Sequence, residues 1–158
     1  MPVPEFVLEL RRHVGHAPLW LIGSTAVVLR EIDGAPHVLL VRRADTGGWS
    51  PVTGIVDPGE GPYETAVREC REEAGVEVVA ERLVWVRPTG MVSYPNGDRS
   101  HYLDHTLRCR WVSGEPHVAD DENLDARWWP VTGLPELRGE FAERVAVALA
   151  DQPETRLG

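Results

Sequence analysis

Three closely spaced glutamates, Glu69, Glu72 and Glu73, are the residues of this chain best suited to bind a metal ion. On an α-helix, residues three and four positions apart lie on one face, so these carboxylates would point the same way. Like charges at that spacing repel each other and cost about 0.2–0.5 kcal/mol per exposed pair. Mg²⁺ and Mn²⁺ prefer oxygen ligands and would remove the repulsion. The spacing therefore predicts a site for a hard divalent cation.

The segment that carries these glutamates is predicted to be a short amphipathic helix. Gly61 and Pro62 suit its start, since proline is tolerated in the first turn of a helix. Gly75 suits its end, because glycine readily adopts the left-handed conformation that follows many helices. Apolar side chains recur with helical spacing on the face opposite the carboxylates, at Tyr63, Ala66, Val67, Cys70 and Ala74. One face is therefore expected to pack on a core while the other presents carboxylates.

Arg68 lies between the two helix faces, four residues from both Glu64 and Glu72. Its guanidinium can therefore hold a carboxylate in place from the side. The competing interpretation of Glu72 and Glu73 is an ordinary solvated acidic face, which many helices carry. A longer pattern around the helix favours the metal site.

The residues from Gly54 to Val76 resemble the Nudix box, whose pattern is G-x5-E-x7-R-E-U-x-E-E-x-G-U with U a bulky aliphatic residue. One position departs from it, because Cys70 stands where Ile, Leu or Val is usual. Cysteine behaves as a small buried hydrophobe, so the departure affects packing rather than chemistry. The positions that match are Gly54, Glu60, Arg68, Glu69, Glu72, Glu73, Gly75 and Val76.

This resemblance implies an α/β fold, the Nudix-type α/β/α sandwich with a mixed central sheet. It also implies hydrolysis of a nucleoside diphosphate linked to another moiety, with water attacking a phosphorus atom of the pyrophosphate. Mg²⁺, or alternatively Mn²⁺, would neutralise the diphosphate oxygens and activate the water. The implied metal ligands are Glu69, Glu72 and Glu73, with the backbone carbonyl of Gly54 completing the coordination.

The resemblance gives supporting roles to two further box residues and leaves the general base open. Arg68 is expected to hold the acids rigid, and Glu60 to orient the site rather than to bind metal. Family members take the base either from the box, where Glu72 is a candidate, or from a loop outside it.

The acidic segment before the Trp-Trp-Pro sequence offers Asp120, Asp121 and Glu122 as bases outside the box. We favour Glu122, because many family members place a catalytic acid just before the corresponding strand. The competing interpretation of this segment is an ordinary solvated turn.

Three residues near the box are candidates for binding substrate. Trp49 could stack on a base or ribose, although tryptophan in a sheet more often packs in the core. Arg42 and Arg43 end a predicted strand, where side chains alternate, so only one of them is expected to face inward and contact phosphate.

Charge and composition narrow the possible functions. A net charge of −9 argues against non-specific binding to nucleic acid or membranes. All 16 basic residues are arginine, which excludes Schiff-base chemistry and a Walker-type phosphate lysine. The two cysteines, Cys70 and Cys109, are expected to be buried free thiols, which suits a reducing compartment. The N-terminus has no apolar signal-peptide core, so a cytoplasmic protein is expected.

Predicted elements along the chain alternate in type, as in a layered α/β domain. Residues 1–16 form an N-terminal extension with a helix at 4–13, and residues 44–54 form a loop that leads into the box. An amphipathic helix is expected at 136–150. Strand-like segments cover residues 18–30, 37–43, 77–87, 91–94, 99–112 and 126–131. No linker divides the chain, so residues 1–158 are expected to form a single Nudix hydrolase domain.

Two substrate classes are compatible with this chain. One is a nucleoside diphosphate derivative such as ADP-ribose, and the other is a (deoxy)nucleoside triphosphate cut to monophosphate and pyrophosphate. A catalytically silent ligand-binding module is a third alternative, but such modules normally have a broken acid set, and here the set is intact. The partner is expected to be a small nucleotide, and a homodimer is possible.

Overall fold

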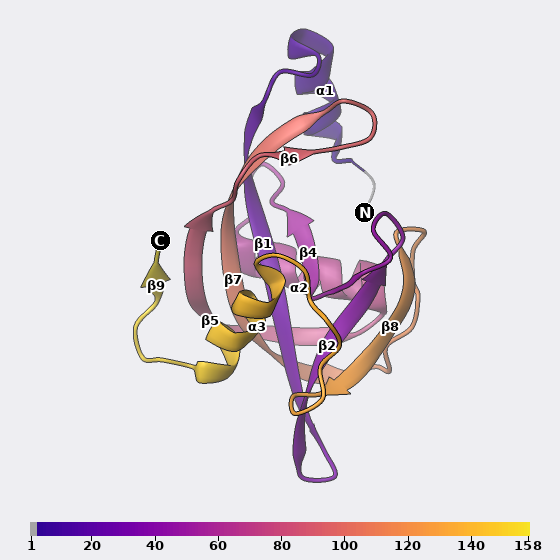
Figure 1. Cartoon of the computed structure of the whole chain (residues 1–158), viewed down its shortest axis with the longest axis vertical. Helices are drawn as coiled ribbons and strands as arrows, with labels where there is room; N and C mark the ends of the chain where they lie inside the picture. The colour runs from indigo at the N-terminus through magenta and orange to yellow at the C-terminus, as the bar shows by residue number, and fades with distance from the viewer. Residues whose placement is uncertain (1–2) are drawn as a thin grey trace.

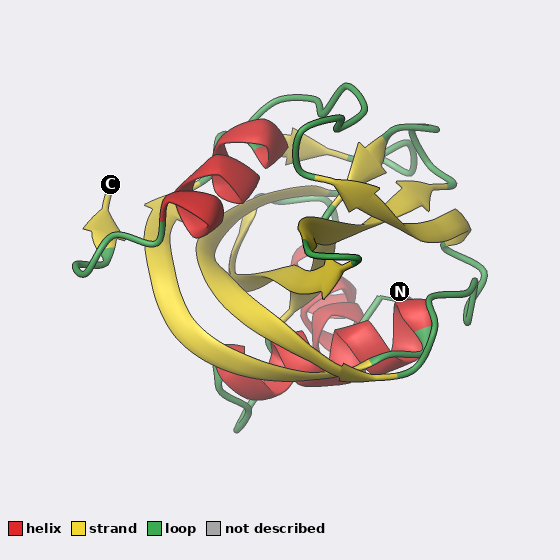
Figure 2. Cartoon of the chain, turned by 90° about the horizontal axis from the view of Figure 1, so that it is seen from below, coloured by secondary structure: helices red, strands yellow, loops and turns green. Residues whose placement is uncertain are grey.

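The computed structural model describes residues 3–158 as a curved, nine-stranded sheet flanked by helices (Figures 1 and 2). Figure 2 shows α2 (Pro62–Ala74) on one face of the sheet and α3 (Phe141–Ala150) on the other. Helix α1 (Glu5–Val14) lies at one end of the molecule near β6 (Figure 1). The strands are β1 (Leu19–Ile32), β2 (Ala35–Arg43), β3 (Trp49–Ser50), β4 (Val52–Ile55), β5 (Glu77–Pro88), β6 (Val92–Ser93), β7 (Arg99–Ser113), β8 (Asn123–Pro130) and β9 (Arg156–Leu157).

The sheet is organised around β1, which pairs with three other strands. It runs parallel to β7 from Leu19 to Leu29, and it is antiparallel to β2 and β4. Strand β5 is antiparallel to β7 and carries the short β9 as a parallel neighbour. The predicted α/β fold with a mixed sheet is therefore confirmed. The topology also places β4, which contains Gly54, beside the middle of β1.

Side chains of β1 alternate between two core layers, as the pleat of a strand requires. Ala26 and Val28 belong to the layer that contains the buried face of α2, whereas Val27 belongs to the layer that contains Val145 of α3. Burying one such side chain stabilises the fold by about 1.5–3 kcal/mol. The two cysteines are buried free thiols, as predicted, and both lie in the α2 layer.

Helix α2 begins and ends where glycine and proline predict. Gly61 is its N-cap, and the Glu64 carboxylate accepts a hydrogen bond from the Gly61 N–H at 3.3 Å. Gly75 has a φ of +67°, a left-handed backbone conformation that glycine adopts without strain. The predicted apolar face is correct for Ala66, Cys70 and Ala74. Tyr63 differs, since 43% of its surface is exposed.

Short elements account for most differences from the sequence prediction. Residues 44–54 are not wholly a loop, because β3 and β4 form there, although each is very short. The last helix begins at Phe141 rather than at 136, since Leu137 pairs with Trp49 in an isolated bridge and Gly139 adopts a φ of +55°. Strand β8 begins three residues earlier than expected, at Asn123, and β9 was not predicted.

The predicted N-terminal helix is confirmed and is fixed to the β7 strand. Val7 is buried, and the Arg11 guanidinium donates to the Arg99 carbonyl at 2.8 Å and to Ser100 Oγ at 3.2 Å. Within residues 3–158, the helices are too short or too polar to cross a membrane. The assignment of residues 1–158 to a single domain stays a prediction.

Candidate active site

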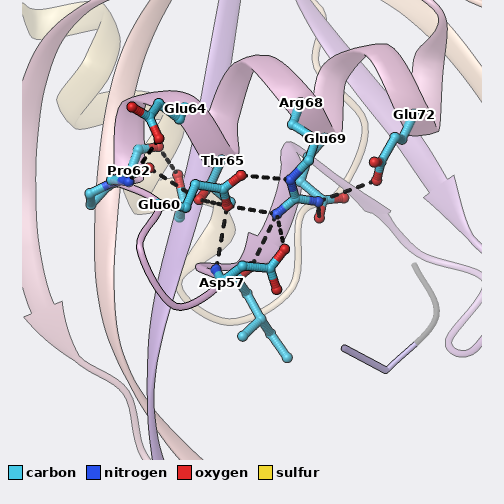
Figure 3. Close-up of polar contacts among 11 residues, drawn as sticks. Asp57, Glu60, Pro62, Glu64, Thr65, Arg68, Glu69 and Glu72 are labelled. Atoms are coloured by element: carbon cyan, nitrogen blue, oxygen red, sulfur yellow. Dashed lines mark hydrogen bonds and ion pairs between the residues drawn. The ribbon is translucent and has the colours of Figure 1, made fainter. Parts of the chain in front are cut away.

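Arg68 is the centre of a carboxylate cluster on α2 (Figure 3). Its Nε and Nη2 each donate to a different oxygen of Glu60 at 2.8 Å, which is a bidentate pair. Its Nη1 donates to Glu69 at 2.7 Å and to Glu72 at 3.3 Å. Hydrogen bonds from Arg68 and then Thr65 hold the pKa of Glu60 down at about 2, against the cost of its burial. One cation therefore orients three carboxylates, as the sequence suggested for Arg68.

Glu69 is a buried carboxylate, and one of its two oxygens has no hydrogen-bond partner within residues 3–158. Only 1% of its surface is exposed. One oxygen accepts the Arg68 hydrogen bond, while Oε2 is buried with no hydrogen-bond partner within residues 3–158. Burial, followed by the nearby charge of Glu73, raises the pKa of Glu69 to about 8. A buried acceptor without a donor is costly, so this oxygen is suited to a ligand that supplies positive charge.

Gly54 on β4 provides the space in which Glu69 sits. A Cβ at this position would lie 2.4 Å from the Glu69 Cγ and 2.6 Å from its Oε1, closer than non-bonded atoms approach. The first glycine of the box is therefore required by the packing of Glu69. This close approach brings the β4 backbone and the Glu69 side chain together, which is the arrangement expected if the Gly54 carbonyl shares a ligand with Glu69.

A second carboxylate cluster surrounds Glu73, which is only 5% exposed. A carboxylate oxygen of Glu73, one of Asp120 and one of Glu122 lie within 4.8 Å of one another. Burial raises the pKa of Glu73 to about 7, and the negative charge of Asp120 adds to this rise. Positive charges, including that of Arg43, oppose it. The sequence placed Asp120 and Glu122 only as candidate bases, and it did not predict that they would form a potential cation site with Glu73. Asp121 is outside this group and is exposed.

Backbone hydrogen bonds fix the acidic loop against α2 and β2. The N–H groups of His117 and Ala119 donate to the last carbonyls of α2, at Ala74 (3.1 Å) and Glu73 (3.3 Å). On the other side, the N–H of Ala44 donates to the Glu122 carbonyl at 2.8 Å. The loop therefore caps the C-terminal end of the helix and carries its acids to the box.

Together these carboxylates fit a hard divalent cation. They supply the oxygen ligands that Mg²⁺ and Mn²⁺ prefer. Within residues 3–158, the Oε2 atom of Glu69 has no hydrogen-bond partner and can therefore bind a cation, and the missing side chain of Gly54 leaves space beside the Glu69 carboxylate. The predicted ligands are not equivalent, because Glu69 and Glu73 are buried whereas the Glu72 side chain is 49% exposed. Glu72 is held by Arg68 at the rim of the site.

Of the three residues predicted to bind substrate, Arg43 is the one whose charge acts on the carboxylate cluster, because it opposes the rise in the pKa of Glu73. It donates to Thr53 Oγ1 at 3.3 Å and pairs with Asp45. Arg42 is exposed and donates to the Gly47 carbonyl at 3.1 Å.

Trp49, the third residue, packs in the α3 layer. Its ring meets that of Trp129 edge-on at 5.2 Å, and the Arg127 guanidinium lies 5.3 Å from its centre. The indole is therefore occupied by protein contacts on the side of the sheet opposite α2.

Comparison with known proteins establishes the family. The NUDIX domain profile matches residues 21–150, so the chain belongs to the Nudix family, as the box predicted.

Named relatives differ in how much of their length this chain matches. Identity to the dihydroneopterin triphosphate diphosphatase of Escherichia coli is 28% over 132 residues, covering 78% of this chain and 88% of that enzyme. Identity to the NAD-capped RNA hydrolase NudC of Pseudomonas aeruginosa is 36% over 103 residues, covering 64% of this chain but only 34% of that protein. The chain thus matches about a third of the length of that hydrolase.

Solved structures agree on the fold. The crystal structure of an ADP-ribose pyrophosphatase from Streptococcus suis superposes with a TM-score of 0.65 at 24% identity, covering 87% of this chain and 98% of the other. The common fold is therefore retained at low sequence identity.

Proposed function

We propose that this Nudix protein is a hydrolase of phosphoanhydride bonds, and specifically a divalent-metal-dependent pyrophosphohydrolase that cleaves a nucleoside diphosphate linked to another group, such as ADP-ribose. The observation that carries the proposal is the pair of buried carboxylates, Glu69 and Glu73, whose pKa values are raised to about 8 and about 7. Buried acids held close together are costly unless a bound cation compensates them.

Glu69 and Glu73 are the proposed principal ligands for Mg²⁺ or Mn²⁺, with Glu72 and the Gly54 carbonyl completing the set. When bound, the metal would neutralise charge on the diphosphate oxygens and increase the acidity of a water molecule. Arg68 holds Glu69 and Glu72 in place through hydrogen bonds of 2.7 and 3.3 Å. Arg43 is proposed to contact a phosphate because its positive charge acts on Glu73, and its Nε and Nη2 would exchange their hydrogen bonds with Asp45 for the phosphate. Arg42 and Trp49 remain weaker candidates for substrate contact.

Glu122 is proposed as the general base, because its carboxylate lies in the cluster with Glu73. It would take a proton from water as the water oxygen bonds to phosphorus. The bond from that phosphorus to the bridging oxygen breaks, and the electron pair leaves with the departing phosphate. The products are a nucleoside monophosphate and the phosphorylated second group. Asp120 and Glu72 are the alternative bases.

A second candidate function is hydrolysis of a nucleoside triphosphate to monophosphate and pyrophosphate. It is favoured by the relative from Escherichia coli, named for a triphosphate substrate, of which the chain covers 88%. A silent binding module has less support, since the box acids and Arg68 are intact and held in a connected cluster.

The test is a product-release panel with Mg²⁺, Mn²⁺ or a chelator. ADP-ribose, nucleotide sugars and nucleoside triphosphates would be compared, with auxiliary phosphatase or pyrophosphatase to identify the products. We expect metal-dependent turnover of the diphosphate derivatives, reduced roughly a hundredfold or more in Glu73→Gln. Glu154→Gln, an exposed change near the C-terminus, is the matched control. Turnover that persists in chelator would refute the metal requirement.

A further inference from the structure

A cavity of about 640 Å³ lies between the N-terminal helix and the box, within the size range of small-molecule sites. One side is built by the start of α1 and the other by the box loop and α2. Its lining includes Glu5 and Phe6 from the helix, Asp57 and Pro58 from the loop, and Arg68 and Glu72 from α2. Because Arg68 and Glu72 belong to the carboxylate cluster, a substrate bound to that cluster has this cavity directly beside it.

The wall formed by α1 is held in place before any ligand binds. Val7, next to Phe6 in the first turns, is buried, and Arg11 anchors the helix to β7 through the Arg99 carbonyl and Ser100. Glu9 is itself held by Arg12 and by His13, whose ring nitrogen lies 3.2 Å from its carboxylate. A fixed wall loses little conformational entropy when it contacts a ligand, so it can contribute to selectivity.

The charge of the lining disfavours an additional phosphate. Four carboxylates contribute to it, from Glu5, Glu9, Asp57 and Glu72. Among the described residues of this lining, Arg68 is the single cation, and its guanidinium already pairs with Asp57, Glu60, Glu69 and Glu72. A terminal phosphate placed here would face like charge without a free guanidinium to pair with it.

The carboxylates and apolar side chains that line the cavity suit a neutral ligand group with many hydroxyls. Carboxylates such as Glu5 accept hydrogen bonds from hydroxyl groups. Phe6, Pro4 and Pro58 provide apolar surface on which the C–H face of a sugar ring can pack. We propose that the first turn of α1 binds the non-nucleotide group of the substrate, and that this group is a neutral sugar. The proposal rests on the proposed function, and it names the class of the second group.

The experiment measures kcat/KM for ADP-ribose and a nucleotide hexose against that for a nucleoside triphosphate. In Phe6→Ala we expect a loss of roughly tenfold for the sugar substrates, mainly through KM, with little change for the triphosphate. In Glu5→Gln we expect a gain of roughly two- to fivefold for the triphosphate. Leu8→Ala, on the exposed part of the same helix, and Glu154→Gln are the matched controls.

The outcomes separate this inference from the proposed function. If the wild-type protein turns over the sugar substrates and the ratio of sugar to triphosphate activity is unchanged in Phe6→Ala and Glu5→Gln, the role of α1 is refuted and the proposed function stands. If both substrate classes lose activity in Glu5→Gln and recover at higher Mg²⁺, the carboxylate acts on the metal and the inference also fails. If the wild-type protein turns over no diphosphate derivative, the proposed function itself is wrong.

Discussion

Two buried charge clusters lie on opposite faces of the same sheet, and they differ in how well their charges are matched. On the α3 side, Asp104 and Arg144 form a buried pair. On the α2 side, Glu69 and Glu73 are equally buried, but the guanidinium that pairs with Glu69, that of Arg68, is shared with Glu60 and Glu72.

Polar atoms of the α3-side cluster satisfy one another. Asp104 accepts hydrogen bonds from Thr25 Oγ1 at 2.8 Å and from Thr106 Oγ1 at 3.0 Å, and its Oδ2 lies 3.6 Å from the Arg144 Nε. Arg144 also donates to Thr25 at 3.0 Å. Such a network is complete without a ligand, and its role is to join α3 to the sheet.

In contrast, the α2-side cluster is incomplete within the described chain. Glu69 Oε2 is buried without a donor, and burial raises the pKa values of Glu69 and Glu73. The comparison separates a matched buried pair, which joins α3 to the sheet, from unmatched buried carboxylates, which are the ones that we propose bind a metal ion.

Removing Arg144 should produce the largest change in stability. Arg144→Ala leaves Asp104 buried without its cation, so the free energy of unfolding should fall by about 3–5 kcal/mol. Denaturant unfolding measures this change. Arg110→Ala is the matched control, because its partner Glu81 is at the surface, and it should cost at most about 1 kcal/mol. Equal losses in the two variants would contradict the distinction between the buried pair and a surface pair.

Replacing Glu122 should lower kcat and leave the free energy of unfolding nearly unchanged. Glu122→Gln removes the proposed proton acceptor and should lower kcat roughly a hundredfold or more. Metal affinity, measured by titration of Mn²⁺, should change much less than in Glu73→Gln. An unchanged kcat would return the role of base to Glu72 or Asp120.

Filling the space at Gly54 should disturb the unmatched cluster alone. In Gly54→Ala the new methyl group would overlap Glu69, so we expect a loss of about 1–3 kcal/mol in stability together with weaker metal binding. Gly90→Ala is the control, since a Cβ there has nothing within 4 Å. Normal metal binding in Gly54→Ala would argue against a role for this close contact.

The pH dependence of stability should show how much ionisation of the buried Glu69 carboxylate destabilises the folded protein. Its pKa is about 8 in the folded protein and 4.5 ordinarily, so the folded state retains a proton that the unfolded state has lost between these values. Stability of the metal-free protein should therefore fall as pH rises through this window. In chelator, the melting temperature of the wild type should fall between pH 5 and pH 8, and that of Glu69→Gln should fall by several degrees less over the same range. Parallel curves would contradict the assignment.

The sequence was sufficient to predict the box helix and its functional register. Local signals at Gly61, Pro62 and Gly75 set its ends, and helical spacing placed Glu69 and Glu73 on one face. These features depend on residues close together in the chain, which is why they could be predicted before the structure.

Features that depend on distant contacts could not be predicted in this way. The acidic loop reaches Glu73 because Ala119 and Ala44 make backbone hydrogen bonds between segments far apart in sequence. The burial of Glu69 depends on the approach of β4, a strand of four residues whose glycine gave no strand signal. The cavity beside α1 likewise requires the N-terminal helix to fold back toward the box.

Calorimetric titration of Mg²⁺ and Mn²⁺ into the chelator-treated protein tests most directly whether the unmatched carboxylates form a metal site. The wild type should bind the cation and release protons at pH 7, because Glu69 and Glu73 hold protons near that pH until the metal displaces them. Glu73→Gln should bind at least roughly tenfold more weakly and release fewer protons, while Asp104→Asn should leave the affinity of the folded protein unchanged. Equal binding by the wild type and Glu73→Gln would contradict the assignment of the metal site to this cluster.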